Sequence, residues 1–183
     1  MGRGAGADGS GERSGLRPPP LQAEPMLRVL AEHGVDFVII GGFALSAHGV
    51  IRGTKDIDVM PDPRPDNIGR LVAALRALNA EVMLAEDFNP AELGLAPDED
   101  GLSLGGNWVL RTRLGRLDIM QDVAGAKSYD ALRSAAVERD VPGAGPFWFS
   151  GFDDLIAMKV AAGRPQDEVD VTSLHRARSP RDR

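Results

Sequence analysis

Two aspartates separated by a single residue are the part of this sequence best suited to chemistry. Asp56 and Asp58 stand in the alternating segment Asp56-Ile57-Asp58-Val59-Met60. In a strand of this pattern the two carboxylates share one face, while Ile57 and Val59 point into the core. Two carboxylates this close repel each other unless a cation lies between them, and Mg²⁺ prefers carboxylate oxygens and substrate phosphates. The pair predicts a magnesium site; two acids that simply face solvent are the alternative.

A glycine turn upstream is suited to binding phosphate. The apolar run Phe37 to Ile40 predicts a buried strand, Gly41 and Gly42 interrupt it, and Phe43 to His48 has the composition of a short helix. Backbone N–H groups at such a turn, with the positive end of a helix dipole behind them, favour an anion. An ordinary turn is the alternative. Thirteen residues separate Gly42 from Asp56, which lets the chain form the helix and return beside the first strand. The glycine turn and the two acids are therefore predicted to border the same site.

Asp118 is a third candidate acid. It lies in the segment Gly115 to Met120, which alternates as a strand after a hairpin turn at Leu114-Gly115. On that strand Asp118 would either complete the metal site or accept a proton from an attacking hydroxyl. The neighbouring arginines would hold an RNA or protein acceptor, or form a solvated edge; they are Arg111, Arg113 and Arg116.

Strands and helices must alternate to position these residues. Apolar residues at helical spacing predict helices near Leu27–Ala31 and Ile68–Leu78, and an acidic start predicts another from Asp153 to Lys159. Short apolar runs predict further strands, and an acidic loop is expected near Asp98 to Asp100. These runs are 81–84, 107–112, 116–120 and the core segment 147–149. The pattern indicates an α/β or α+β domain with a mixed sheet flanked by helices.

Composition narrows the classes of site and partner. The chain of 183 residues has a net charge of −6, no cysteine and only three histidines, which excludes thiolate and histidine-rich zinc sites. Any metal should be held by oxygen. No apolar run is long enough to cross a bilayer, so we expect no membrane contact and a cytoplasmic location. We expect one domain over residues 21–174, with polar, disordered tails at 1–20 and 175–183.

Taken together, the motifs resemble the nucleotidyltransferase (polymerase-beta-like) superfamily. The segments Ile40 to Ala44 and Arg52 to Asp58 are similar to those of AbiEii-type nucleotidyltransferases, and 154–159 with 163–170 are similar to their closing helix motif. The resemblance implies the nucleotidyltransferase fold, Mg²⁺ on Asp56, Asp58 and Asp118, and a bound nucleoside triphosphate. It also assigns the nucleotide to five residues, with the lysine reaching the triphosphate: Gly41, Gly42, Arg52, Thr54 and Lys159.

Several functions are compatible with that resemblance. The leading hypothesis is a magnesium-dependent enzyme that moves a nucleoside monophosphate from the triphosphate to a hydroxyl on RNA or protein, in a toxin–antitoxin or defence system with a cognate partner. A second is transfer to a small molecule such as an aminoglycoside, suggested by the acidic stretch Glu92 to Asp100. A third is a non-catalytic binding or antitoxin-like module that keeps the fold.

Overall fold

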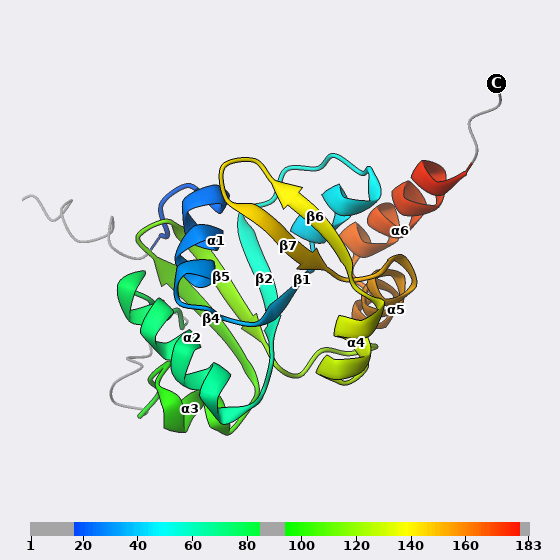
Figure 1. The fold of residues 1–183 in the computed structure, drawn as a ribbon. Coiled ribbons are helices and arrows are strands. Elements are labelled where there is room, and N and C mark those ends of the chain that lie inside the picture. The colour runs from blue at the N-terminus through cyan, green and yellow to red at the C-terminus, as the bar shows by residue number, and fades with distance from the viewer. Residues whose placement is uncertain (1–16, 85–93, 180–183) are drawn as a thin grey trace, which may run out of the picture.

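A seven-stranded mixed sheet runs through the computed structural model, which describes residues 17–84 and 94–179 (Figure 1). The strand order is β3-β4-β5-β2-β1-β7-β6. The strands are β1 (Phe37–Ile40), β2 (Asp56–Pro61), β3 (Glu81–Val82), β4 (Asn107–Thr112), β5 (Gly115–Met120), β6 (Val137–Val141) and β7 (Gly145–Phe149). The expected mixed α/β architecture is confirmed.

The centre of the sheet holds the two strands that carry the candidate acids. All four residues of β1 are buried, as the uninterrupted apolar run predicted. β1 pairs antiparallel with β2, and β2 pairs in parallel with β5. The register of that parallel pair places Asp58 directly beside Asp118 and Asp56 beside Arg116. Residues 60 positions apart in the sequence are thus side by side on the sheet.

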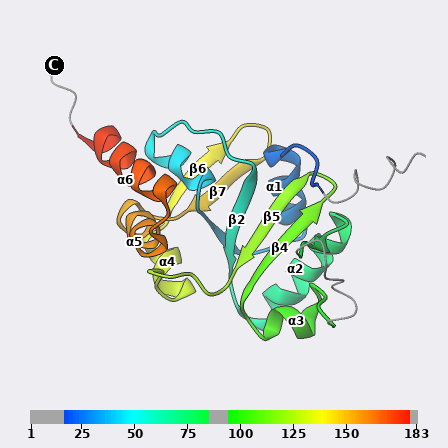
Figure 2. The same cartoon turned by 180° about the vertical axis from the view of Figure 1, so that it is seen from behind.

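Helices cover the sheet in two groups (Figures 1 and 2). α1 (Ala23–Glu32) and α2 (Pro65–Ala77) pack against each other on one side, with the short α3 (Glu99–Ser103) against α2. α5 (Phe152–Ala162) and α6 (Pro165–Arg178) pack together beside the 3₁₀ helix η2 (Phe43–His48). The remaining helix, α4 (Tyr129–Ala135), contacts β1.

Local sequence explains where α2 begins and which face it buries. Pro65 occupies the first helical turn, where its missing N–H costs nothing. Ile68, Leu71 and Leu75 lie one helical turn apart and are at most 2% exposed. This stripe closes the core on the side of the sheet opposite the acids.

Some expected elements differ from the structure. The prediction of an acidic loop near Asp98 to Asp100 is wrong, because these residues begin helix α3. The side chain of Asp98 accepts a hydrogen bond of 2.9 Å from Gly101 N–H and caps the start of the helix. Neither α4 nor β6 was predicted. Helix α6 continues to Arg178, whereas the folded domain was expected to end at Leu174. The expected tail at 1–20 lies mostly outside the described residues.

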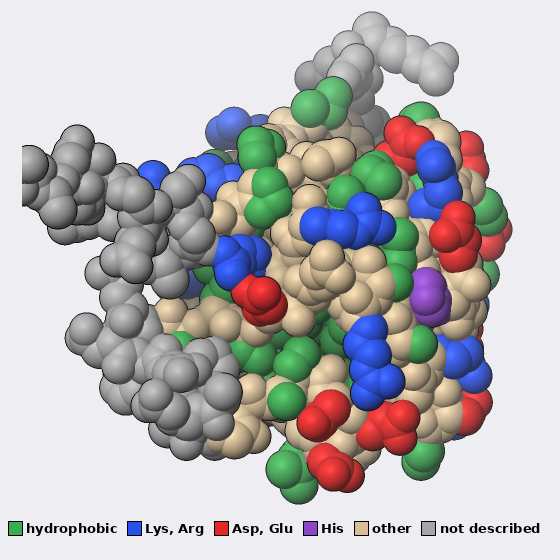
Figure 3. Space-filling model, turned by 90° about the vertical axis from the view of Figure 1, so that its left-hand side faces the viewer, with side chains coloured by type: hydrophobic (Ala, Val, Ile, Leu, Met, Phe, Trp, Pro, Cys, Tyr) green, Lys and Arg blue, Asp and Glu red, His purple; other side chains and the backbone are tan. Residues whose placement is uncertain are grey.

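The described surface shows no patch of one charge on the face over α1 and α2. Basic and acidic side chains are interspersed there around scattered apolar ones (Figure 3). Such a face offers no track of cations for a nucleic-acid backbone. Within the described residues, none of the helices combines the length and apolar character needed to pass through a bilayer.

Candidate active site

Asp56, Asp58 and Asp118 lie on one face of the two neighbouring strands β2 and β5. Burial, followed by the charges of Asp56 and Asp118, raises the pKa of Asp58 to about 6. Burial also raises the pKa of Asp118, although Arg116 opposes that shift. Both shifts arise mainly from burial of the carboxylates, with a further contribution from neighbouring acids, and a cation at this place would stabilise the charged forms.

The glycine turn after β1 lies directly against Asp58. Gly41 has a φ of +66°, and a Cβ at this position would overlap the Oδ2 atom of Asp58. The backbone N–H of Gly42 donates to the same carboxylate, which lowers the pKa of Asp58 in opposition to burial. A Cβ at Gly42 would come within 2.5 Å of Arg52 Nη2 and 3.1 Å of Thr54 Oγ1. Glycine is therefore required at Gly41, whereas a side chain at Gly42 would displace the flexible end of Arg52.

A substitution at Gly41 tests this close approach. We expect Gly41→Ala to displace the Asp58 carboxylate and to lose magnesium-dependent nucleotide binding, in addition to about 1–2 kcal/mol of left-handed backbone strain. Gly49→Ala is the matched control, since Gly49 has a φ of +81° but nothing within 4 Å of its added Cβ. Thermal unfolding and titration calorimetry separate the two effects. Equal losses of binding in both variants would contradict the assignment to Asp58.

Arg116 lies among the three acids and was predicted only as an acceptor contact or a solvated residue. Its guanidinium donates to both oxygens of Asp118, at 2.8 and 2.5 Å, and its Nε lies 3.7 Å from Asp56 Oδ2. A signal for this pairing exists in the sequence, since residues 116 and 118 share one face of a strand. Thr54 Oγ1 donates to Asp56 Oδ1 at 2.9 Å, so the Asp56 carboxylate contacts Thr54 through one oxygen and lies near Arg116 through the other.

An ionic cluster with a buried centre, formed by Lys159, Asp167 and Asp170, lines the same cleft as the acids. Lys159 Nζ, in a residue only 4% exposed, lies 2.6 Å from Asp170 and 3.1 Å from Asp167. Arg164 Nε donates to Asp167 at 2.7 Å, and Arg52 Nε lies 3.3 Å from Asp170. We refer to these five residues as the α5–α6 ion cluster. Three cations share two carboxylates there, so the cluster carries a surplus of positive charge. Contacts of Lys159 and Arg52 with phosphate remain predictions.

Two cavities meet at the acids. One, of about 340 Å³, is called the basic cleft; the other, of about 500 Å³, is called the apolar cavity. The basic cleft is bordered by Gly42, Arg52, Thr54, Lys55, Asp56 and Gln166. The apolar cavity is bordered by Val109, Met120, Val123, Leu155 and Met158. The wall between them is charged and belongs to both: Asp58, Arg116, Asp118, Lys159, Arg164 and Asp167.

The predicted nucleotide and metal residues therefore converge. Gly42, Arg52, Thr54 and the acids line the basic cleft, and Gly41 lies on the other side of Asp58, in the apolar cavity. Among residues 17–84 and 94–179, however, no group of three acids or histidines is arranged to hold a metal ion. Arg116 already occupies both oxygens of Asp118. The sequence analysis placed Arg164, Asp167 and Asp170 in the closing helix motif but did not predict them as site residues, because the contacts of Asp167 and Asp170 with Lys159 and Arg52 join residues from different elements.

Other residues considered from the sequence lie away from the acids. Arg111 pairs with Glu81, and Arg113 Nε donates to the carbonyl of Ala77 at 3.2 Å. His48 Nε2 lies 2.8 Å from the carbonyl oxygen of Ser150, so it joins η2 to the loop before α5. Of the expected cluster of arginines, Arg116 alone lines the two cavities described above.

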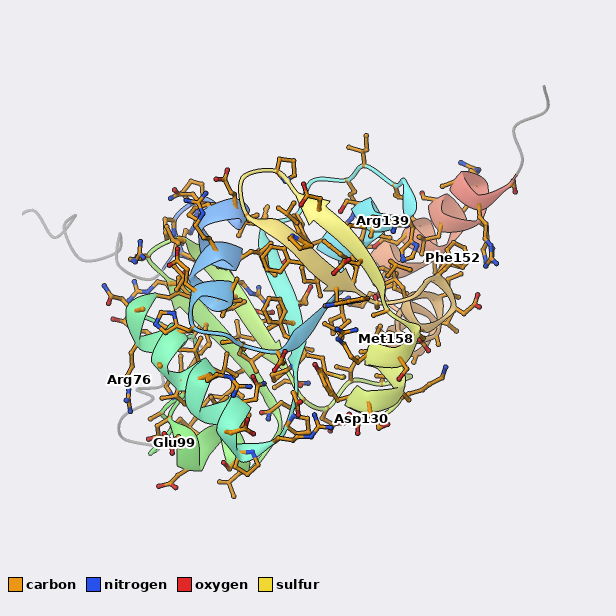
Figure 4. All side chains as sticks on the ribbon, viewed as in Figure 1. Arg76, Glu99, Asp130, Arg139, Phe152 and Met158 are labelled. Carbon is orange, nitrogen blue, oxygen red and sulfur yellow. The ribbon has the colours of Figure 1, made fainter. Side chains whose placement is uncertain are left out.

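The acidic stretch expected to attract cationic acceptors also lies elsewhere. Residues 92 and 93 fall outside the described residues, and Glu99 lies on α3 against α2. Glu99 is far from Met158, which borders the apolar cavity (Figure 4). The described part of this stretch therefore stabilises the start of α3 and does not reach either cavity.

Comparisons with known proteins identify the fold. No protein-family model matches the sequence, and no curated protein is significantly similar to it. A crystal structure of ANT(2")-Ia with adenylyl-2"-tobramycin matches with a TM-score of 0.53 and 16% identity, over 84% of this chain and 86% of that chain. A solution structure of the antibiotic-resistance factor ANT(2'')-Ia matches with a TM-score of 0.50 and 17% identity, over 83% and 78%.

A lincomycin-bound crystal structure of the lincosamide antibiotic adenylyltransferase LnuA matches with a TM-score of 0.57 and 11% identity. This match covers 86% of the present chain and 98% of that chain. The expected nucleotidyltransferase fold, a mixed sheet flanked by helices, is confirmed. The narrower resemblance to AbiEii-type proteins finds no support in these matches and remains a prediction.

Proposed function

We propose that this protein is a magnesium-dependent transferase that moves a nucleotidyl group from a nucleoside triphosphate to the hydroxyl of a small-molecule acceptor. One observation carries the proposal. The acids Asp56, Asp58 and Asp118 line the basic cleft together with the α5–α6 ion cluster, which carries surplus positive charge. A triphosphate with its metal ion has the complementary pattern, because the cation needs carboxylates and the phosphate oxygens need cations.

Magnesium fits the chemistry of these donors. Asp56 and Asp58 would hold it, since both offer hard oxygen ligands and burial, with the two neighbouring acids, raises the pKa of Asp58. Bound there, the ion would neutralise phosphate charge in the transition state. Asp118 becomes available as a third ligand or as a base only when Arg116 releases it.

The transfer reaction needs residues that stabilise the leaving group and a residue that accepts the proton. The acceptor oxygen bonds to the α-phosphorus while the bond between that phosphorus and the pyrophosphate oxygen breaks. Arg52 and Lys55 border the basic cleft and would stabilise the departing pyrophosphate. The hydroxyl proton would pass to Asp118, which lies beside Asp58 in the sheet.

A small-molecule acceptor has more support than RNA or protein. Of the similar structures, one is described as an antibiotic-resistance factor, in one crystal structure with adenylyl-2"-tobramycin, and another as a lincosamide antibiotic adenylyltransferase with bound lincomycin. Arg111 and Arg113, which were expected to bind a macromolecular acceptor, are engaged away from the cleft. A toxin–antitoxin role has no comparable support.

Calorimetry tests the proposed function. We expect the native chain to bind ATP or another nucleoside triphosphate only with magnesium, and the Asp56→Ala, Asp58→Ala double variant to lose at least about 100-fold in affinity. Asp153→Ala is the matched control, because the Asp153 side chain is 89% exposed on α5. A native chain that binds no nucleotide would instead favour the non-catalytic interaction module. A stable stoichiometric partner that is unaffected by Asp58→Ala would then support that module.

A further inference from the structure

The apolar cavity is a second, partly open space that shares Asp58, Asp118, Lys159 and Arg164 with the basic cleft but not Arg52 or Lys55. Val109 and Met120 from the sheet, Val123 from the loop after β5, and Leu155 and Met158 from α5 border it. Its volume of about 500 Å³ is in the range that accommodates a drug-sized molecule. Met158 is labelled on α5 in Figure 4, on the side of the helix bundle near the sheet.

The loop that closes this cavity is firmly packed. Gly125 approaches α5 so closely that a Cβ there would lie 2.5 Å from the carbonyl oxygen of Ala157. Ala126 N–H donates to the carbonyl of Val123 at 3.0 Å, which closes a turn that contains Gly125. Val123 is therefore held against the core as a fixed part of the wall.

The direction of the transfer assigns the cavity to the acceptor. In-line displacement requires the attacking hydroxyl and the departing pyrophosphate to lie on opposite sides of the α-phosphorus. Arg52 and Lys55, the cations suited to pyrophosphate, border the basic cleft and not the apolar cavity. An acceptor must then approach from the other side of Asp58 and Asp118, where the apolar cavity opens.

Charge and polarity of the lining restrict the acceptor's chemistry. Four acids and three cations border the cavity: Asp118 is paired with Arg116, and Asp167 with Lys159 and Arg164, whereas Asp58 and Asp122 form no ion pair within the described residues. The lining therefore carries a formal surplus of one negative charge, which suits one ammonium group better than several. The apolar side chains instead favour a ligand with a hydrocarbon or aromatic face.

From these observations, and resting on the proposed function, we propose that the apolar cavity binds the acceptor, and that this acceptor is a small amphipathic molecule with an apolar face and a hydroxyl group. Its apolar part contacts Val123 and Met158, while its hydroxyl faces Asp118.

Methyl NMR with a neutral probe tests the assignment. n-Octyl β-D-glucoside, used below its micelle concentration, has an apolar chain and uncharged hydroxyls. We expect it to shift the methyl signals of Val109, Met120, Val123, Leu155 and Met158, in the free protein and in the presence of magnesium with α,β-methylene-ATP. Val123→Trp should weaken probe binding by about tenfold or more, with nucleotide affinity changed by less than about twofold. Val169→Trp is the control, since Val169 is 57% exposed on α6 and borders neither cavity.

Three results would overturn the assignment. Nucleotide alone could shift the same methyl signals and lose about tenfold in affinity in Val123→Trp, which would make the cavity a nucleobase site. Tobramycin could displace the probe, which would favour a polycationic acceptor. The probe could also leave every lining methyl unchanged. If Val123→Trp does not fold, Val123→Phe replaces it. A native chain that binds no nucleotide refutes the proposed function itself, whatever the probe does.

Discussion

Replacing Asp58 by asparagine should abolish nucleotidyl transfer while making the metal-free protein more stable at neutral pH. The native pKa of Asp58 is about 6, against 3.8 for an ordinary aspartate, mainly because of burial and the neighbouring acids. The folded chain therefore binds this proton more tightly than the unfolded chain. Below pH 4 the stabilising effect of protonation is complete, and it is lost as the pH rises to about 6. Asparagine mimics the protonated form and avoids the loss.

The size of this effect follows from the shift in pKa. A shift of about two units corresponds to about 2–3 kcal/mol, and partial access to solvent reduces it to about 2 kcal/mol. We expect Asp58→Asn to unfold at a temperature several degrees above the native chain at pH 7 without magnesium, and at the same temperature at pH 4. Transfer should fall by at least about 100- to 1000-fold, because the carboxylate that would hold the metal is gone.

Magnesium separates this explanation from a general effect of the substitution. Added magnesium with nucleotide should raise the unfolding temperature of the native chain and leave that of Asp58→Asn unchanged. Asp153→Asn, at an exposed position on α5, should behave like the native chain throughout. A native stability that does not change between pH 4 and pH 7 would contradict the assigned burial of charge at Asp58.

The positions of the three acids show which parts of the site could be predicted from the sequence and which could not. Alternation along β2 and β5 predicted the faces of Asp56, Asp58 and Asp118 correctly, because side-chain direction in a strand depends only on parity. The parallel pairing that brings Asp58 beside Asp118 needed the whole sheet, since the strands are separated by α2, α3, β3 and β4. Local pattern identifies the acids, and tertiary pairing brings them together.

The missed elements have weak local patterns. β6 is Val137 to Val141, and its three central residues are exposed and charged, so alternation is lost at this sheet edge. α4 has only seven residues, too few for an apolar stripe to recur. The start of α3 was predictable in principle, because Asp98 is a good N-cap with Glu99 and Asp100 in the first turn.

Lys159→Met is the second substitution with a large expected effect, and it should act on stability. Lys159 is 4% exposed, and its partners Asp167 and Asp170 are each 1% exposed. Removing one member of a buried ion pair costs about 3–5 kcal/mol, because the remaining charge is uncompensated. Arg164 and Arg52 still contact the two acids, so we expect the lower limit, about 3 kcal/mol. The unfolding temperature should fall by on the order of 10 °C.

Two further variants are needed to interpret the effect of Lys159→Met: Lys127→Met and the double variant Lys159→Met, Asp170→Asn. Lys127 pairs with the buried Asp154 at 2.8 Å, but its own side chain is 62% exposed, so Lys127→Met should lower the unfolding temperature less than Lys159→Met, because it removes the cation of one buried acid and not of two. Adding Asp170→Asn to Lys159→Met should recover part of the lost stability, because it removes one of the uncompensated acids. A Lys159→Met variant that keeps its stability but loses nucleotide affinity would show that the lysine is a free phosphate ligand. Loss of stability with partial rescue would show that it acts through Asp167 and Asp170, holding α6 so that Arg52 and Arg164 face the triphosphate.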